Sequence, residues 1–187
     1  MPSVAAALVA GSLAFVGATA DDVAGLSAQL ALTQPGRRRR VRRAHVSGVV
    51  VLVAFAVILG ETLRSVPLAW FAPLALFPLA FAARAWSNRR REASARPRGA
   101  WVTAFATVST GGDAVAVWTP LVRGSDAVRL VAVLAAFVAW ELVLLGATDV
   151  LARHERPRRW VAAATARGRA VLYVALAALV LIECRVL

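Results

Sequence analysis

The chain has 187 residues, and its 22 basic residues are all arginines, which gives a formal net charge of +12. Apolar residues make up 60% of the sequence, and the charged residues fall mainly in blocks between apolar runs, as in helical membrane proteins. Because the arginines lie between segments of membrane-spanning length and not on a soluble scaffold, the charge argues against nucleic acid as a partner. Cys184 is the only cysteine, so a disulfide framework or a thiolate metal cage within one chain is excluded.

Six apolar runs predict the fold, because a helix needs about 20 apolar residues to cross the core of a bilayer. They indicate an all-α membrane protein whose single transmembrane domain covers residues 1–187 and whose partner is the lipid bilayer. Prolines in the third run predict a kinked helix, and the sixth helix begins either at 170 or nearer Trp160. The predicted spans are 4–32, 46–63, 66–83, 100–122, 127–151 and 170–186.

The arginines predict the orientation of the chain in the membrane. Eighteen of the 22 follow the first, third and fifth spans, and these three loops share one side of the membrane if there are six spans. The positive-inside rule makes that side cytoplasmic, so both the N and C termini are expected outside. The three groups are Arg37, Arg38, Arg39, Arg40, Arg42 and Arg43; Arg84, Arg89, Arg90, Arg91, Arg96 and Arg98; and Arg153, Arg156, Arg158, Arg159, Arg167 and Arg169.

The chain divides near residue 98 into two halves of three spans, about 1–98 and 99–187. Each half opens with a long apolar helix that is interrupted by acid, Gly17-Ala-Thr-Ala-Asp-Asp22 in the first and Ser109-Thr-Gly-Gly-Asp113 in the second. Because three is an odd number, the second half enters the membrane from the opposite side, which is the arrangement of an inverted-repeat transporter. Two unrelated polar patches are the alternative interpretation.

Four acids lie well inside the predicted spans, where an ionised carboxylate costs about 2.5–3.5 kcal/mol. They are Asp21, Asp22, Asp113 and Glu141. His45 is at the edge of a span, and no basic residue is expected at the depth of these acids. A bound cation or protons are therefore expected to neutralise them. For any one of the acids, a protonated carboxyl that is hydrogen-bonded to a neighbouring helix is the alternative.

The residues around these acids predict an oxygen-rich cation site. Asp21 and Asp22 point about 100° apart on a regular helix, so they face one ion only if the helix is broken there. Gly111 and Gly112 precede Asp113, and paired glycines indicate unwound backbone or close helix contact. Carbonyl, carboxylate and hydroxyl oxygens suit a hard or borderline divalent cation. The predicted metal site comprises Asp21, Asp22, Asp113, Thr19, Ser109, Thr110 and Glu141.

Other polar and aromatic residues have structural interpretations. Asp149 is expected to pair with Arg153, four residues later on the same helix. The tryptophans are expected to be mostly interfacial anchors, with Trp140 as the expected core residue. The sequence has no nucleophile elbow, Walker loop, dinucleotide fingerprint or zinc-protease helix, so it predicts neither an enzyme nor a bound cofactor.

The two acid motifs read Gly17-Ala-Thr-Ala-Asp-Asp-Val23 in the first predicted span and Ala104-Phe-Ala-Thr-Val-Ser-Thr-Gly-Gly-Asp-Ala-Val-Ala-Val-Trp-Thr-Pro-Leu121 in the fourth. They resemble those of the cadmium-resistance transporter family, in the lysine-exporter superfamily of small six-span exporters. The resemblance implies that Asp22, with Asp21, and Asp113 hold the ion near the middle of the membrane. The family pattern has Asn after the acid of the second motif, where this chain has Ala114. It also has a Gly-Gln pair in the second span, where this chain reads Ala44-His-Val-Ser-Gly48.

The resemblance implies efflux of a divalent heavy-metal cation such as cadmium, manganese or zinc across the cytoplasmic membrane of a prokaryote. Exchange of protons or sodium at the same acids would supply the energy, since the sequence has no nucleotide-binding element. Two alternatives stay open: an exporter of a small cationic organic solute such as a basic amino acid, and a non-transporting scaffold whose arginine loops hold anionic lipid or a partner. A homodimer is compatible with a bundle of this size, but no interface signal decides it.

Overall fold

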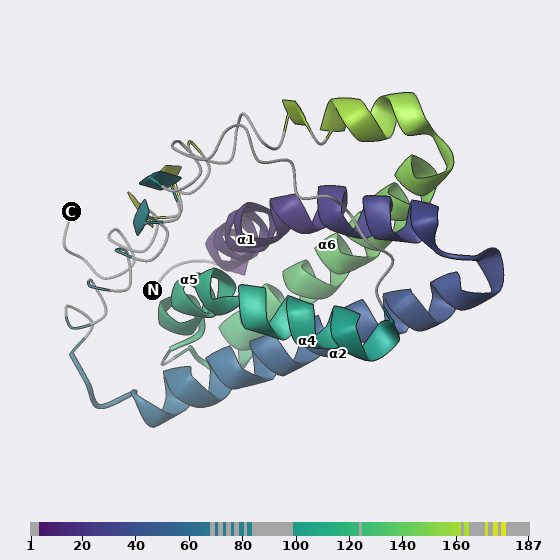
Figure 1. The fold of residues 1–187 in the computed structure, drawn as a ribbon. Coiled ribbons are helices and arrows are strands. Elements are labelled where there is room, and N and C mark those ends of the chain that lie inside the picture. Colours follow the sequence, from purple (N-terminus) through teal and green to yellow (C-terminus); the bar gives the residue numbers. More distant parts are fainter. Residues whose placement is uncertain are drawn as a thin grey trace.

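The computed structural model describes residues 4–67, 99–123 and 125–161, together with scattered residues between 70 and 83 and between 163 and 178. This part of the chain is helical and contains no strand. Its elements are α1 (Val4–Leu32), α2 (Pro35–Thr62), α4 (Ala100–Thr110), α5 (Gly112–Val122) and α6 (Ala127–Arg153) (Figure 1).

Two helices, α2 and α6, are each long and apolar enough to cross a membrane, and α1 is a third if its two bent parts count as one span. Large apolar side chains cover their outward faces, for example Val50 and Phe55 on α2 and Val131 and Val138 on α6. Such exposure suits contact with lipid. The described residues therefore form an all-helical bundle with two, or up to three, candidate membrane spans.

The predicted spans agree with the helices in part. The first span matches α1, and the fifth begins where α6 begins. The second is corrected, because α2 begins at Pro35, well before the predicted start at 46. Pro35 suits the first position of a helix, and the arginines after it are good helix formers, so the arginine run is helical and not a loop. Half of the third predicted span and most of the sixth lie outside the described residues, so the number of six spans stays a prediction.

The helices pack across the two predicted halves of the chain. α1 lies along α6, while α2 lies along both α4 and α5 (Figure 1). The remaining major contact joins α1 to α5. Each of these pairs takes one helix from the first half and one from the second, so the bundle depends on contacts between the halves.

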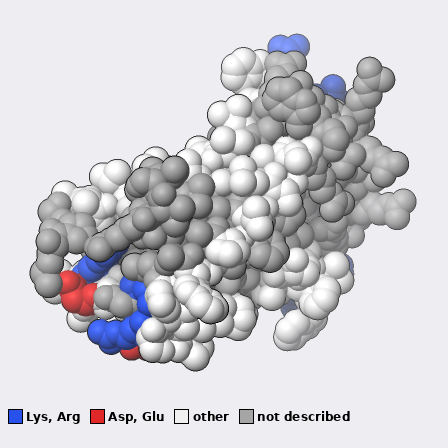
Figure 2. Space-filling model, turned by 90° about the vertical axis from the view of Figure 1, so that its left-hand side faces the viewer, with Lys and Arg blue, Asp and Glu red and all other residues white. Residues whose placement is uncertain are grey.

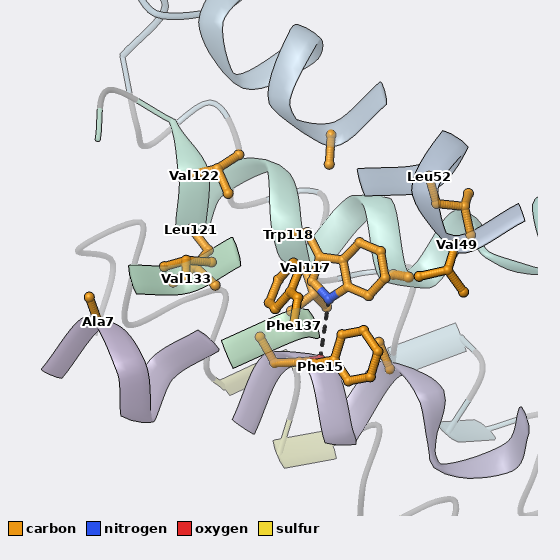
Figure 3. Packing of buried hydrophobic residues seen from close by; sticks show 14 of the residues in the cluster. Ala7, Phe15, Val49, Leu52, Val117, Trp118, Leu121, Val122, Val133 and Phe137 are labelled. Carbon is orange, nitrogen blue, oxygen red and sulfur yellow. Dashed lines mark hydrogen bonds between the residues drawn. The ribbon is translucent and has the colours of Figure 1, made fainter. Parts of the chain in front are cut away.

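An aromatic cluster forms the centre of the core. The ring of Phe15 on α1 is stacked on Trp118 of α5 with centroids 5.7 Å apart, and Phe137 of α6 is tilted against both (Figure 3). The Trp118 Nε1–H donates a hydrogen bond to the Ala14 carbonyl at 3.4 Å. The prediction that Trp140 is the core tryptophan is wrong, because its side chain is 38% exposed whereas Trp118 is 1% exposed. Trp140 is one position before the buried Glu141, about 100° away around α6.

Ion pairs mark the end of the bundle where α2 begins and α6 ends. The predicted pair of Asp149 with Arg153 is confirmed at 3.0 Å, and Arg42 of α2 also reaches Asp149 at 3.6 Å. The arginines that begin α2 and those that end α6 therefore lie at one end, as the orientation argument requires. On the face drawn in Figure 2, a band of uncharged described residues lies between the charged side chains at its lower left and those at its top.

Candidate functional site

Both acid motifs coincide with breaks in helices, as their sequences predict. α1 bends by 50° between Val4–Ala20 and Asp22–Leu32, so the break falls at Asp21. The second motif is broken at Gly111, where α4 ends and α5 begins. A break at each motif is the geometry that frees carbonyl oxygens and helix ends for a ligand.

Gly111, at the second break, lies against the Leu52 side chain of the neighbouring helix α2. A Cβ built at Gly111 would lie 2.2 Å from Cδ1 of Leu52 on α2 and 3.0 Å from the Thr107 carbonyl oxygen. A Cβ at Gly112, in contrast, would meet nothing within 4 Å. The first glycine thus permits close contact with α2, and both expectations for the glycine pair, a broken helix and close packing, hold at Gly111.

Asp113 lies in the first turn of α5 and is buried, with 6% of its surface exposed. Its Oδ1 accepts a hydrogen bond from the Ala114 N–H at 2.9 Å. The N-terminus of a helix favours negative charge, so α5 stabilises this carboxylate from one side. Asp113 is therefore held at depth by its own helix end.

The other oxygen ligands predicted at the breaks have different environments. Thr19 is buried and donates its hydroxyl hydrogen to the Phe15 carbonyl at 2.8 Å, whereas Asp22 is half-buried. Ser109 is exposed, and its hydroxyl bonds to the carbonyls of Phe105 and Ala106 on its own helix. The side chains of Asp21 and Thr110 lie outside the described residues.

Glu141 faces the bundle interior from α6 and meets His45 of α2. The distance from His45 Nε2 to Glu141 Oε1 is 3.6 Å, and the two residues are 2% and 8% exposed. The prediction that no basic residue lies at the depth of the acids is therefore wrong for Glu141. The helix start caused the error: with α2 beginning at Pro35, His45 lies inside the helix and not at the edge of a span.

A row of polar side chains leads from this pair along α4. His45 Nδ1 lies 3.3 Å from Thr107 Oγ1, and Thr107 in turn donates to the Thr103 carbonyl at 3.1 Å. The Gln29 side-chain amide of α1 donates to Thr103 Oγ1. Four helices, α1, α2, α4 and α6, thus contribute to one buried polar cluster, which consists of Gln29, His45, Thr103, Thr107 and Glu141.

The polar cluster and the two acid motifs are separate candidate regions of the bundle. Within the described ranges, no group of three or more His, Cys, Asp or Glu side chains is placed to hold a metal ion. Comparisons of the chain with protein-family models, with curated proteins and with solved structures gave no match. The resemblance of the two acid motifs to a transporter family therefore stays a prediction.

Sequence reasoning missed His45, Gln29, Thr103 and Thr107. The spacing of Thr103 and Thr107 could have indicated a polar helix face, because residues four apart lie on the same face of α4. The burial of His45 depended on where α2 begins, and the hydropathy of the chain does not mark that point because arginines occupy its first turns.

Proposed function

We propose that this protein moves a cation across a membrane, and that buried carboxylates between its two halves bind the cation in transit. The observation that carries the proposal is Glu141. Neither oxygen of this carboxylate accepts a hydrogen bond from any described residue, although the residue is 92% buried on an apolar helix of membrane-spanning length. A buried carboxylate without donors is costly unless a positive species neutralises it.

The pairing of helices supports alternating access by two inverted repeats. A two-fold axis that exchanges the halves would exchange α1 with the α4–α5 segment and α2 with α6. Under this exchange, the contact of α1 with α6 would become the contact of the α4–α5 segment with α2. The contact of α1 with α5 would become a contact between the same two segments. Each of the four main contacts is thus accounted for by one symmetry, and the two broken helices are its equivalent elements.

The proposed substrate is a divalent heavy-metal cation such as cadmium, zinc or manganese, and the proposed direction is efflux. The resemblance of the acid motifs to the cadmium-resistance transporters supports both. Asp22 and Asp113 would bind the ion together with carbonyl oxygens freed at the two breaks, and proton or sodium exchange would drive the cycle.

A metal-tolerance panel in cells tests this function. Cells that express the wild type should tolerate higher concentrations of at least one of cadmium, zinc and manganese than cells with the empty vector, and Asp113→Asn should abolish the difference. Asp126→Asn is the matched control, because Asp126 is exposed and caps α6, and Asn caps a helix about as well as Asp.

If Asp113→Asn protects as well as the wild type, the protein is a scaffold or its site lies elsewhere. If basic amino acids and no metal give a difference, the substrate is an organic cation.

A further inference from the structure

The contact between His45 and Glu141 joins the two halves of the chain away from the helix breaks. His45 is ten residues into α2, and Glu141 is near the middle of α6. Besides the pair itself, the helices around it carry these ionisable residues: Arg37, Arg38, Arg39, Arg40, Arg42, Arg43 and Glu61 on α2; Arg129, Asp149 and Arg153 on α6; Asp113 on α5; and Asp21 and Asp22 on α1, while α4 carries none. Arg42 and Asp149 bind each other.

The hydrogen bonds around His45 favour a proton on Nδ1 of the ring. The Thr107 hydroxyl hydrogen is directed at the Thr103 carbonyl, so Thr107 Oγ1 is left to accept a bond from His45 Nδ1–H. In a neutral imidazole one nitrogen is the donor and the other has a lone pair. Nε2 is then the nitrogen with the lone pair, and it is directed toward Glu141.

When Glu141 is ionised, two acceptors therefore face each other in the interior. Neither His45 Nε2 nor the Glu141 oxygens have a hydrogen-bond partner among the described residues. Their separation of 3.6 Å exceeds that of an N–H···O bond, which is about 2.7–3.2 Å. Two ligands of one tetrahedral zinc ion, with bonds of about 2.0–2.2 Å, are separated by about 3.4 Å. The observed distance is close to that of two ligands on a shared ion.

We propose that His45 Nε2 and the Glu141 carboxylate bind one divalent transition-metal ion of the zinc class. The proposal rests on the proposed function and specifies its substrate. An imidazole ligand favours zinc and similar ions over magnesium and calcium, which bind oxygen ligands almost alone. Thr107 orients the ring from behind, as outer hydrogen-bond partners of metal-binding histidines do. The remaining coordination positions are left to exchangeable ligands, which suits an ion that must leave again.

Cobalt titration of the purified protein tests the site, because bound Co²⁺ absorbs visible light according to its coordination. The chain has two histidines, so His154→Gln leaves His45 as the single imidazole. In that background we expect one equivalent of Co²⁺ to give the intense bands of four-coordinate cobalt, and Zn²⁺ to displace it. His45→Gln and Glu141→Gln should remove the bands. Thr107→Val should weaken binding about 10–100-fold, and Thr107→Ser should restore it.

Histidine NMR gives a second measurement that needs no change in the site. With ¹⁵N-labelled histidine in the same background, the metal-free protein should show a protonated Nδ1 and an unprotonated Nε2. Adding Zn²⁺ should shift the Nε2 resonance and leave Nδ1–H in place. If the Nε2 signal does not respond to Zn²⁺, or His45→Gln binds Co²⁺ as the wild type does, the proposed site is overturned.

The two proposals fail separately. Unchanged cobalt binding in His45→Gln, together with metal tolerance that still depends on Asp113, would overturn the His45–Glu141 site and leave the transport function standing. Cobalt binding that requires His45, in a protein that confers no tolerance to any metal, would support the site and overturn the function.

Discussion

Gly48 of α2 lies so close to Thr107 of α4 that a Cβ at position 48 would be 2.8 Å from the Thr107 Cβ and 2.9 Å from its Cγ2. The Ala104 carbonyl oxygen would be 3.2 Å away. Thr107 is the residue that orients His45, and His45 is one helical turn before Gly48. The contact between α2 and α4 therefore sets the position of the imidazole.

Gly48→Ala is expected to push α2 and α4 apart, because Thr107 Cβ moves only with its backbone. Overpacking of this kind costs about 1–3 kcal/mol. Thermal unfolding in detergent should show a lower midpoint for Gly48→Ala and no comparable loss for Gly25→Ala, where a Cβ would meet nothing within 4 Å. Equal midpoints for the two variants would mean that α2 and α4 are not in this contact.

Trp118→Ala should be among the most destabilising single changes in the described core. It removes a ring that is 1% exposed and packs against Phe15 and Phe137, and such truncations cost about 3–5 kcal/mol. Trp101→Ala is the control, because that side chain is 89% exposed. The same thermal assay should separate the two variants clearly, and a similar loss at Trp101 would contradict the assignment of Trp118 as the core residue.

The sequence predicted the features that depend on local composition. The extents of α1 and α6 follow from long, mainly apolar runs, and the helix breaks follow from Asp21 and Gly111 within such runs. The pair of Asp149 with Arg153 follows from their spacing. These features need only the residues of one segment.

Features that depend on how helices face each other could not be predicted in the same way. Trp118 and Trp140 both lie in apolar helices, and only the rotation of each helix against its neighbours decides which ring is buried. The meeting of His45 with Glu141 joins residues 96 positions apart on different helices. Hydropathy carries no information about that contact.

The packing of α1 on α6 can be tested by a disulfide. A Cβ built at Gly11 lies 3.5 Å from the Ala136 Cβ, within the range of about 3.5–4.5 Å found in disulfides. In a Cys184→Ser background, Gly11→Cys with Ala136→Cys should cross-link under mild oxidation, which a mobility shift on a non-reducing gel would detect. Gly25→Cys with Ala136→Cys should not, because position 25 is about 21 Å further along a helix. The reverse pattern would require a different pairing of these helices.

Arg123 secures the end of α2. Its guanidinium donates to the carbonyls of Leu63 at 3.0 Å and Arg64 at 2.7 Å, and also to that of Val66. Arg123→Gln should lower stability by about 1.5–3 kcal/mol, the usual size for hydrogen bonds to charged groups. It should also speed amide hydrogen exchange at the end of α2. Arg64→Gln, which breaks an exposed pair with Glu61, should cost no more than about 1 kcal/mol. Similar losses in both variants would show that the carbonyl contacts contribute little.

The most direct test of the account is metal flux into proteoliposomes that contain the purified protein and a metal-sensitive dye. We expect the wild type and Asp126→Asn to carry zinc or cadmium across the bilayer at similar rates, and Asp113→Asn to lose at least nine-tenths of the flux. Flux through Asp113→Asn at the wild-type rate would contradict the claim that the Asp113 carboxylate binds the cation in transit, and a wild-type protein that moves no cation would contradict the proposed function.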